Sequence, residues 1–192
     1  MKWIVVAIIL VVAPYTFLTL YFRKPNEPFR PYEDMKNRAN VVRLLAAGYQ
    51  RIPLAAQRPA DPSGARPTPT SAAAGGLPAE LAATLVEPTL LPAEIVSVAA
   101  TGSVASGASY DIRFSCKIPD EQQQQLGGAE LYVKDSDLII VPVYERLNGK
   151  LTARTRDHVV LITVPAGALK AGSYRVTLVA QRSSRTWPLS VK

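Results

Sequence analysis

Cysteine and histidine are almost absent from this chain, whose 192 residues include one of each, Cys116 and His158. A single cysteine excludes a disulfide within the chain and is compatible with a reducing or an oxidising compartment. Zinc centres use several cysteine or histidine ligands, and cupredoxin-type copper centres use two histidines. We therefore expect no metal and no cofactor, and we interpret Cys116 as a small buried core residue.

The motifs of common enzymes are lacking as well. Serine-based acyl transfer would need His158 as the base and an acid to orient it, but the adjacent Asp157 points to the opposite face of a strand. The sequence contains no Gly-x-Ser-x-Gly and no glycine-rich phosphate loop. Asp135 and Asp137 resemble the start of a calcium loop, although two carboxylates on a turn are usually only solvated. We predict no catalytic residues and no enzyme activity.

Charge is lacking between Trp3 and Phe22, and this run has the length of about 20 apolar residues that a bilayer-spanning helix needs. Aromatic residues at its ends and basic residues after it are typical of a membrane interface. Residues 1–24 therefore predict an uncleaved transmembrane anchor, and a signal peptide cleaved after Ala13 is the alternative. The residues that define this anchor are Trp3, Pro14, Tyr21, Phe22, Arg23 and Lys24.

A basic segment, residues 25–56, follows the apolar run. Tyr32 to Tyr49 has apolar residues at helical spacing, which predicts an amphipathic helix. Such a helix contacts anionic lipid headgroups or a partner subunit, or it packs on its own domain. The candidate contact residues are Met35, Lys36, Arg38, Val42, Arg43, Leu45 and Tyr49.

The remaining chain divides into a linker and a β domain. Residues 57–80 are rich in Pro, Ala, Ser, Thr and Gly and predict a semi-stiff spacer. From residue 81 to 192 the period of the apolar residues becomes two, as from Tyr110 to Ile118. We predict a mainly β fold, in which two antiparallel sheets of seven to eight strands form a sandwich.

This β domain resembles the immunoglobulin-like superfold. The resemblance lies in Leu169 to Leu178, where Tyr174 follows a glycine at the start of a strand, and in Trp187 to Val191 as the last strand. The tyrosine resembles the tyrosine corner of that fold. In members with a disulfide, the second cysteine stands where this chain has Val176, so Cys116 has no partner. The resemblance makes Cys116, Tyr174 and Trp187 fold-defining residues, and it implies no particular function.

Flanking charges set the expected location. Arg23, Lys24, Arg30, Lys36 and Arg38 follow the apolar run. The positive-inside rule counts such residues near the ends of a span. They predict a single-pass protein of the bacterial inner membrane with its C-terminal domain on the cytoplasmic face. The periplasmic face is the close alternative, since sandwich domains of such proteins often lie outside the cytoplasm.

The basic charge is concentrated near the N-terminus. The calculated pI is about 9.7. Residues 23–58 carry eight Lys/Arg and three Asp/Glu, a net charge of +5 out of the +7 of the chain. From Leu90 onward, 12 Lys/Arg oppose nine Asp/Glu, a net charge of only +3. The small net positive charge of the β domain therefore does not indicate nucleic-acid binding.

Three segments suited to contact, and none suited to chemistry, suggest a structural function. We expect a non-catalytic accessory subunit that docks to and stabilises a larger bacterial membrane complex, respiratory or photosynthetic. The alternative is a freestanding envelope module that binds glycan, peptide or peptidoglycan. That alternative requires an exposed aromatic cluster, for which Tyr132, Tyr144 and Trp187 are the candidates.

Overall fold

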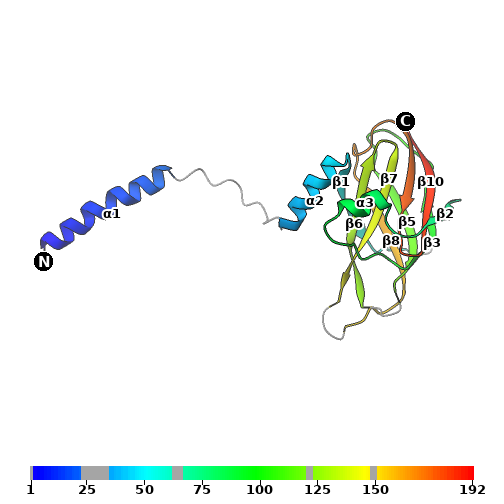
Figure 1. Cartoon of the computed structure of the whole chain (residues 1–192), viewed down its shortest axis with the longest axis horizontal. Helices are drawn as coiled ribbons and strands as arrows, with labels where there is room; N and C mark the ends of the chain where they lie inside the picture. Colours follow the sequence, from blue (N-terminus) through cyan, green and yellow to red (C-terminus); the bar gives the residue numbers. More distant parts are fainter. Residues whose placement is uncertain (1, 23–34, 62–66, 120–122, 148–150) are drawn as a thin grey trace. The chain divides into compact units, whose positions relative to one another are not determined.

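The computed structural model describes residues 2–22, 35–61, 67–119, 123–147 and 151–192. The chain divides into two compact units, Met1–Asn37 and Arg38–Lys192. Helix α1 (Lys2–Phe22) and the first residues of α2 (Met35–Ala46) belong to the first unit. The second unit holds the rest of α2, the short helix α3 (Ala79–Thr84) and the strands, most of which are labelled in Figure 1.

The strands form one continuous sheet that closes on itself. They are β1 (Gln50–Gln57), β2 (Ser71–Ala74), β3 (Glu94–Ala100), β4 (Ser103–Val104), β5 (Tyr110–Lys117), β6 (Gln124–Lys134), β7 (Asp137–Arg146), β8 (Asp157–Val164), β9 (Gly172–Leu178) and β10 (Ser183–Val191). The order of neighbours is β10-β3-β5-β8-β1-β6-β7-β9, and β9 pairs again with β10. These eight strands make a closed barrel, while β2 and β4 pair with β10 outside the ring.

The prediction of an immunoglobulin-like two-sheet sandwich is therefore wrong, and β1 is the reason. β1 pairs antiparallel with β6 from Gln50↔Val133 to Leu54↔Ala129, and with β8 through Ala55↔Thr163 and the next two residues. It thereby joins strands that a sandwich would place in separate sheets. The sheet is also not purely antiparallel, because β7 pairs parallel to β9.

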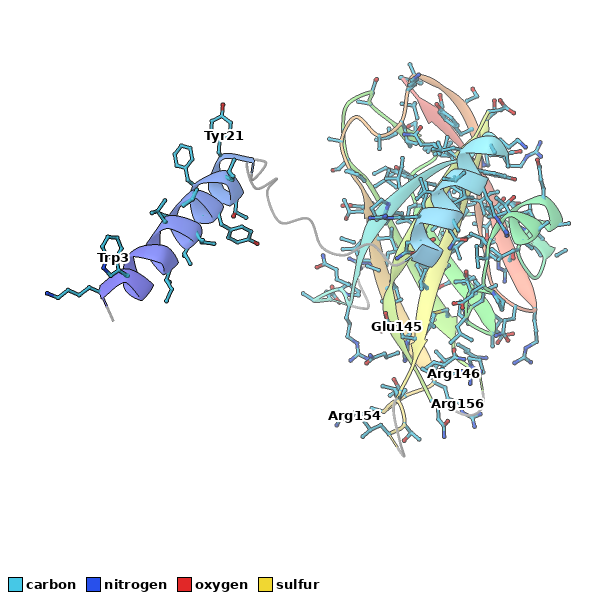
Figure 2. The ribbon with its side chains drawn as sticks, turned by 60° about the vertical axis from the view of Figure 1, so that its left-hand side comes forward. Trp3, Tyr21, Glu145, Arg146, Arg154 and Arg156 are labelled. Carbon is cyan, nitrogen blue, oxygen red and sulfur yellow. The ribbon has the colours of Figure 1, made fainter. Side chains whose placement is uncertain are left out.

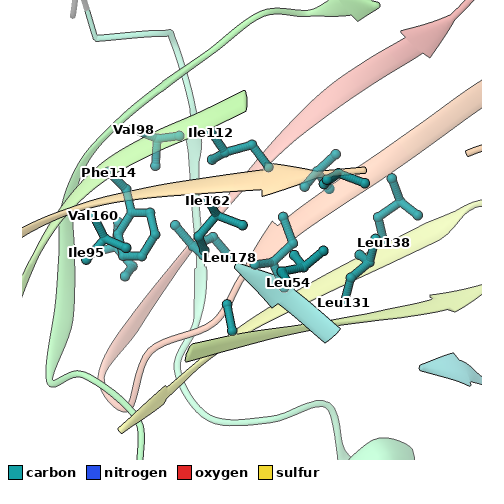
Figure 3. Packing of buried hydrophobic residues seen from close by; sticks show 14 of the residues in the cluster. Leu54, Ile95, Val98, Ile112, Phe114, Leu131, Leu138, Val160, Ile162 and Leu178 are labelled. Atoms are coloured by element: carbon teal, nitrogen blue, oxygen red, sulfur yellow. The ribbon is translucent and has the colours of Figure 1, made fainter. Parts of the chain in front are cut away.

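Apolar side chains from every strand of the ring fill the barrel. The alternation predicted for β5 is confirmed, since Tyr110, Ile112, Phe114 and Cys116 are buried while the residues between them are exposed or half-buried. Figure 3 shows the packing of this core. Small barrels are filled by their inward-facing side chains. The residues labelled there are Leu54, Ile95, Val98, Ile112, Phe114, Leu131, Leu138, Val160, Ile162 and Leu178.

A second apolar layer covers the outer face of β6 and β7 and includes Val179, which directly follows β9. Ile139 and Val141 of β7 are buried there, while Leu138 and Ile140 of the same strand are buried inside the barrel. A strand that is buried on both faces is a continuous apolar run rather than an alternating one. The covering residues come from α2, α3 and the segments beside them, and they include Leu44, Tyr49, Leu81 and Leu91.

Helix α1 has 21 residues and contains Pro14. In the part of the chain that the structure describes, no helix has the length and apolarity needed to cross a membrane. The predicted transmembrane anchor over residues 1–24 is therefore contradicted. The single-pass inner-membrane location, on either face, is contradicted with it.

Candidate interaction surface

The described part of α2 has one buried face and one exposed face. Leu44 is only 1% exposed and belongs to the outer apolar layer, together with Tyr49 just beyond the helix. Tyr49 was predicted as a contact residue, and the structure instead buries it on the chain's own barrel. The helix therefore packs on its own domain, as in the self-packing alternative. It does so through the face that carries Leu44, and not through the stripe with Val42 and Leu45 that the sequence pattern indicates.

The opposite face of α2 carries apolar side chains in contact with solvent. Val42 and Leu45 are 67% and 66% exposed, and Val41 is 41% exposed. Arg38 is exposed as well, and positions 38, 41, 42 and 45 lie on one helix face because they are three and four residues apart. We call these four residues the α2 ridge. Val41 was not among the predicted contact residues, although its spacing from Arg38 and Leu45 could have revealed it.

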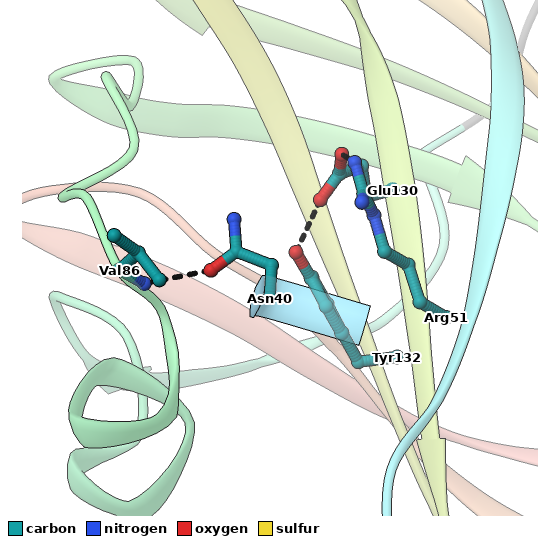
Figure 4. A network of polar contacts seen from close by, with 5 residues as sticks. All are labelled: Asn40, Arg51, Val86, Glu130 and Tyr132. Atoms are coloured by element: carbon teal, nitrogen blue, oxygen red, sulfur yellow. Dashed lines mark hydrogen bonds and ion pairs between the residues drawn. The ribbon is translucent and has the colours of Figure 1, made fainter. Parts of the chain in front are cut away.

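A hydrogen bond holds α2 to the segment after α3. The backbone nitrogen of Val86 donates to Asn40 Oδ1 at 2.7 Å, as Figure 4 shows. Asn40 lies on the side of the helix away from the α2 ridge. Leu44 is buried on the same side. Both contacts therefore leave the ridge uncovered by the described chain.

Polar contacts fix the strands beneath α2. Arg51 of β1 forms an ion pair with Glu130 of β6, and the Tyr132 hydroxyl donates to the same carboxylate (Figure 4). Burial, and then the Glu130 carboxylate, raise the pKa of Tyr132. The phenol therefore stays protonated and remains a donor at neutral pH. This contact binds β1 to β6 on the outer face of the barrel, under the helix.

A second polar group secures the residues after α2. Lys134 forms an ion pair with Glu80 of α3, and its Nζ lies 4.9 Å from the centre of the Tyr49 ring. The Tyr49 hydroxyl donates to Glu80 Oε2 at 3.4 Å. The hydrogen bond with Lys134 lowers the pKa of Glu80. These contacts tie α3, β6 and the end of α2 together.

The remaining predicted contact and anchor residues are scattered or lie outside the described residues. Trp3 and Tyr21 are exposed on α1 and Pro14 is inside it, as Figure 2 shows for the two labelled aromatics. Arg43 is exposed on α2. Arg23 and Lys24, and the side chains of Phe22, Met35 and Lys36, are outside the described residues.

The residues predicted to define the fold are in or beside the barrel core. Trp187 is buried and its Nε1 donates to the Tyr110 hydroxyl at 3.0 Å. The Tyr174 hydroxyl donates to the carbonyl oxygen of Lys170 at 3.0 Å. Cys116 is buried in β5, and its Sγ lies 3.2 Å from the Tyr144 hydroxyl. All three positions therefore serve packing and hydrogen bonding within the barrel.

The lone cysteine and the lone histidine are linked through one tyrosine. The Tyr144 hydroxyl lies 3.4 Å from His158 Nδ1 as well as 3.2 Å from Cys116 Sγ. Burial raises the pKa of the Cys116 thiol to about 11, so the thiol is protonated at neutral pH. A protonated, buried thiol is a poor nucleophile and a poor metal ligand.

The three candidate aromatic residues do not form the exposed cluster that the envelope-binding alternative requires. Tyr132, Tyr144 and Trp187 are 1%, 2% and 3% exposed. Their rings belong to the packed interior or to the layer under α2. They therefore offer no stacking surface to a glycan or a peptide.

Comparisons with known proteins give no relative for this chain: no family model, no curated protein and no solved structure matches it.

Proposed function

We propose that this protein is a non-catalytic accessory subunit that docks on a larger protein complex through the α2 ridge. The observation that carries the proposal is the exposure of Val42 and Leu45 on a helix whose other face is anchored by buried Leu44. Apolar side chains gathered on an exposed, fixed surface are typical of interaction sites. A helix face of this kind binds in an apolar groove of its partner.

The charge of α2 indicates the chemistry of that partner. The helix contains Lys36, Arg38 and Arg43 and no acidic residue. Of these, Arg38 is part of the α2 ridge, so an apolar groove with an acidic rim would match both the apolar side chains and the basic side chain of this face. Helix α1 supports a contact function too, because large apolar side chains such as Leu10, Val11 and Phe17 are exposed on it.

The chemistry of the barrel supports a non-catalytic role. The Cys116 thiol is protonated and buried. The Nδ1 of His158 faces the Tyr144 hydroxyl rather than a carboxylate. A histidine base in acyl transfer is oriented by an acid. This pair therefore supports packing rather than nucleophilic catalysis.

Site-specific photo-crosslinking in the native cells would test the proposal. A photoreactive residue at Val42 of the full chain should crosslink to one protein in a fixed ratio. The matched control is Leu151, which is 63% exposed and lies between β7 and β8. We expect the same residue at position 151 to give no such product.

Charge substitution on the ridge provides the second readout. Burying each apolar side chain is worth about 1.5–3 kcal/mol, so Val42→Glu with Leu45→Glu should weaken co-purification at least about tenfold. Leu151→Glu should leave it unchanged. A partner that is retained by the double variant would contradict the proposal. Binding to anionic lipid vesicles that is lost in Arg38→Gln, with no protein crosslink, would contradict it in favour of lipid.

A further inference from the structure

A small basic pocket lies at the end of the barrel where β7 ends and β8 begins. Its volume is about 220 Å³. We call it the His158 pocket. Figure 2 shows Arg154, one of its lining residues, at this end of the barrel. The walls are formed by Leu126 and Val160, and the polar lining by Arg58, Arg154, Thr155 and His158.

Two guanidinium groups line this pocket and come from distant parts of the sequence. Arg58 directly follows β1 and Arg154 precedes β8. Both are exposed, and among the described residues neither has an ion-pair or hydrogen-bond partner in the structure. Guanidinium groups bind planar or tetrahedral oxyanions through paired hydrogen bonds. Two such groups beside one cavity are therefore suited to a doubly charged anion.

His158 is held in place at the inner side of the pocket. Its Nδ1 lies 3.4 Å from the Tyr144 hydroxyl, and the two ring centres are 5.9 Å apart. Burial is the largest effect on its pKa and lowers it, and nearby Arg58 lowers it further. A hydrogen bond with the backbone of Thr155 and the charge of Asp157 oppose this shift. The pocket thus has cationic side chains beside an imidazole that is neutral at pH 7.

We propose that the His158 pocket binds a phosphate group, either free inorganic phosphate or the end of a small phosphomonoester, between Arg58 and Arg154. The volume sets the size of the ligand, because pockets for larger organic molecules are about 300–1,000 Å³. A carboxylate would leave one of the two positive charges without a partner. This site is separate from the α2 ridge and does not depend on the docking function.

The single histidine makes the test specific, because only one imidazole Hε1 resonance belongs to this chain. The full chain is titrated with inorganic phosphate at pH 7.5, with chloride as the reference at equal ionic strength. We expect a saturable shift of the His158 resonance with phosphate and none with chloride. With sulfate, whose charge is constant across the titration, the pKa of His158 should rise by about one unit, because a nearby opposite charge favours the charged form.

Arginine variants identify the binding groups. Arg58→Gln and Arg154→Gln should each weaken phosphate binding at least tenfold. Arg43→Gln is the matched control, because it removes the same charge from an exposed position on α2. Glycerol 3-phosphate, compared with inorganic phosphate and glycerol, distinguishes the two sources: tighter binding assigns a phosphomonoester, and equal or weaker binding assigns free phosphate. A phosphate effect no larger than that of chloride, or equal affinity in all three variants, would overturn the proposal.

Discussion

The Nε1 of Trp187 donates a hydrogen bond to the Tyr110 hydroxyl at 3.0 Å, and that hydroxyl donates to the carbonyl oxygen of Thr101 at 2.9 Å. Trp187 is in β10 and Tyr110 is in β5, which are separated by β3 in the ring. The bond therefore connects two strands that are not adjacent, across the barrel interior. It lies near the short pairing of β10 with β3, which consists of one residue pair, Ser183↔Glu94. Burial raises the pKa of Tyr110, which keeps the phenol protonated.

Tyr110→Phe should destabilise the barrel by about 1–3 kcal/mol, because it leaves the buried Trp187 N–H without an acceptor. The matched control is Tyr174→Phe, which removes a hydroxyl whose bond to Lys170 is exposed to solvent. Its cost should be below about 1 kcal/mol, since water replaces the lost partner. Urea denaturation of both variants measures the difference. Equal losses would show that the Trp187–Tyr110 bond has no special importance.

Leu54→Ala should cost about 2–4 kcal/mol, the usual effect of truncating a leucine in a packed core. Leu54 lies in β1 and packs in the barrel interior with residues from the other strands. Val96→Ala is the control, because Val96 is 47% exposed and such surface changes stay within about 0.5 kcal/mol. The denaturant midpoints of the two variants measure the loss in the free energy of unfolding. A loss for Leu54→Ala as small as that for Val96→Ala would mean that β1 does not close the barrel.

Most strands from β3 to β10 could be predicted from the sequence, and the closure of the sheet could not. The alternation in β5 indicates its buried face directly. β1 is different, because Pro53 interrupts a short apolar stretch and a proline argues against a central strand. The ring depends on this strand, which lies far in sequence from β6 and β8. Local patterns do not report pairing between such distant segments.

The exposed face of α2 was only partly predictable from the sequence. Helical spacing identified Val42 and Leu45, and both are exposed. The same spacing grouped them with Tyr49, which lies beyond the end of α2 and is buried. The choice between the two faces of the helix is made by the apolar layer on β7, where Leu44 packs near Ile139 and Val141. A helical pattern alone does not contain that information.

Gly75→Ala should destabilise the chain by about 1–3 kcal/mol, the range found for overpacking. An added Cβ would stand 2.2 Å from the carbonyl oxygen of Gln181 and 2.4 Å from the carbonyl carbon of Arg182, and backbone atoms cannot move aside. Gly102→Ala is the control, because nothing lies within 4 Å of its added Cβ. Hydrogen exchange should show loss of protection in β2, which pairs with β10. Unchanged protection in Gly75→Ala would contradict the close approach of these segments.

Cys116 should be unreactive toward a thiol reagent until the barrel unfolds. The thiol is 1% exposed, and burial raises its pKa to about 11. At pH 8 only about one thiol in a thousand is then ionised, and the thiolate is the reacting form. Labelling with a chromogenic disulfide reagent should be complete in 8 M urea and negligible in buffer over the same time. Rapid stoichiometric labelling of the folded chain would contradict this environment for Cys116.

The stability of the folded chain should fall as the pH decreases from 7.5 to 5.5, and His158 should account for part of that fall. Burial lowers the pKa of His158 in the folded state, while in the unfolded chain it is about 6.5. Below that value the unfolded chain binds a proton that the folded chain resists, so the free energy of unfolding decreases. At a pH above the unfolded pKa, the imidazole is neutral in the folded and in the unfolded chain, and the contribution of His158 to the free energy of unfolding is fully present.

His158→Gln should therefore flatten the pH dependence between 5.5 and 7.5, because glutamine has no proton to bind in either state. Urea unfolding at each pH measures it, in buffers free of phosphate and sulfate, since a bound oxyanion would raise the pKa of His158 and weaken the effect. The pKa of Glu80 and that of Glu94 are lowered by Lys134 and Lys117, and their contributions are lost only at more acidic pH. The contrary result would be that the unsubstituted chain becomes more stable as the pH falls from 7.5 to 5.5, and that His158→Gln removes this gain. It would show that the folded barrel favours the imidazolium form of His158.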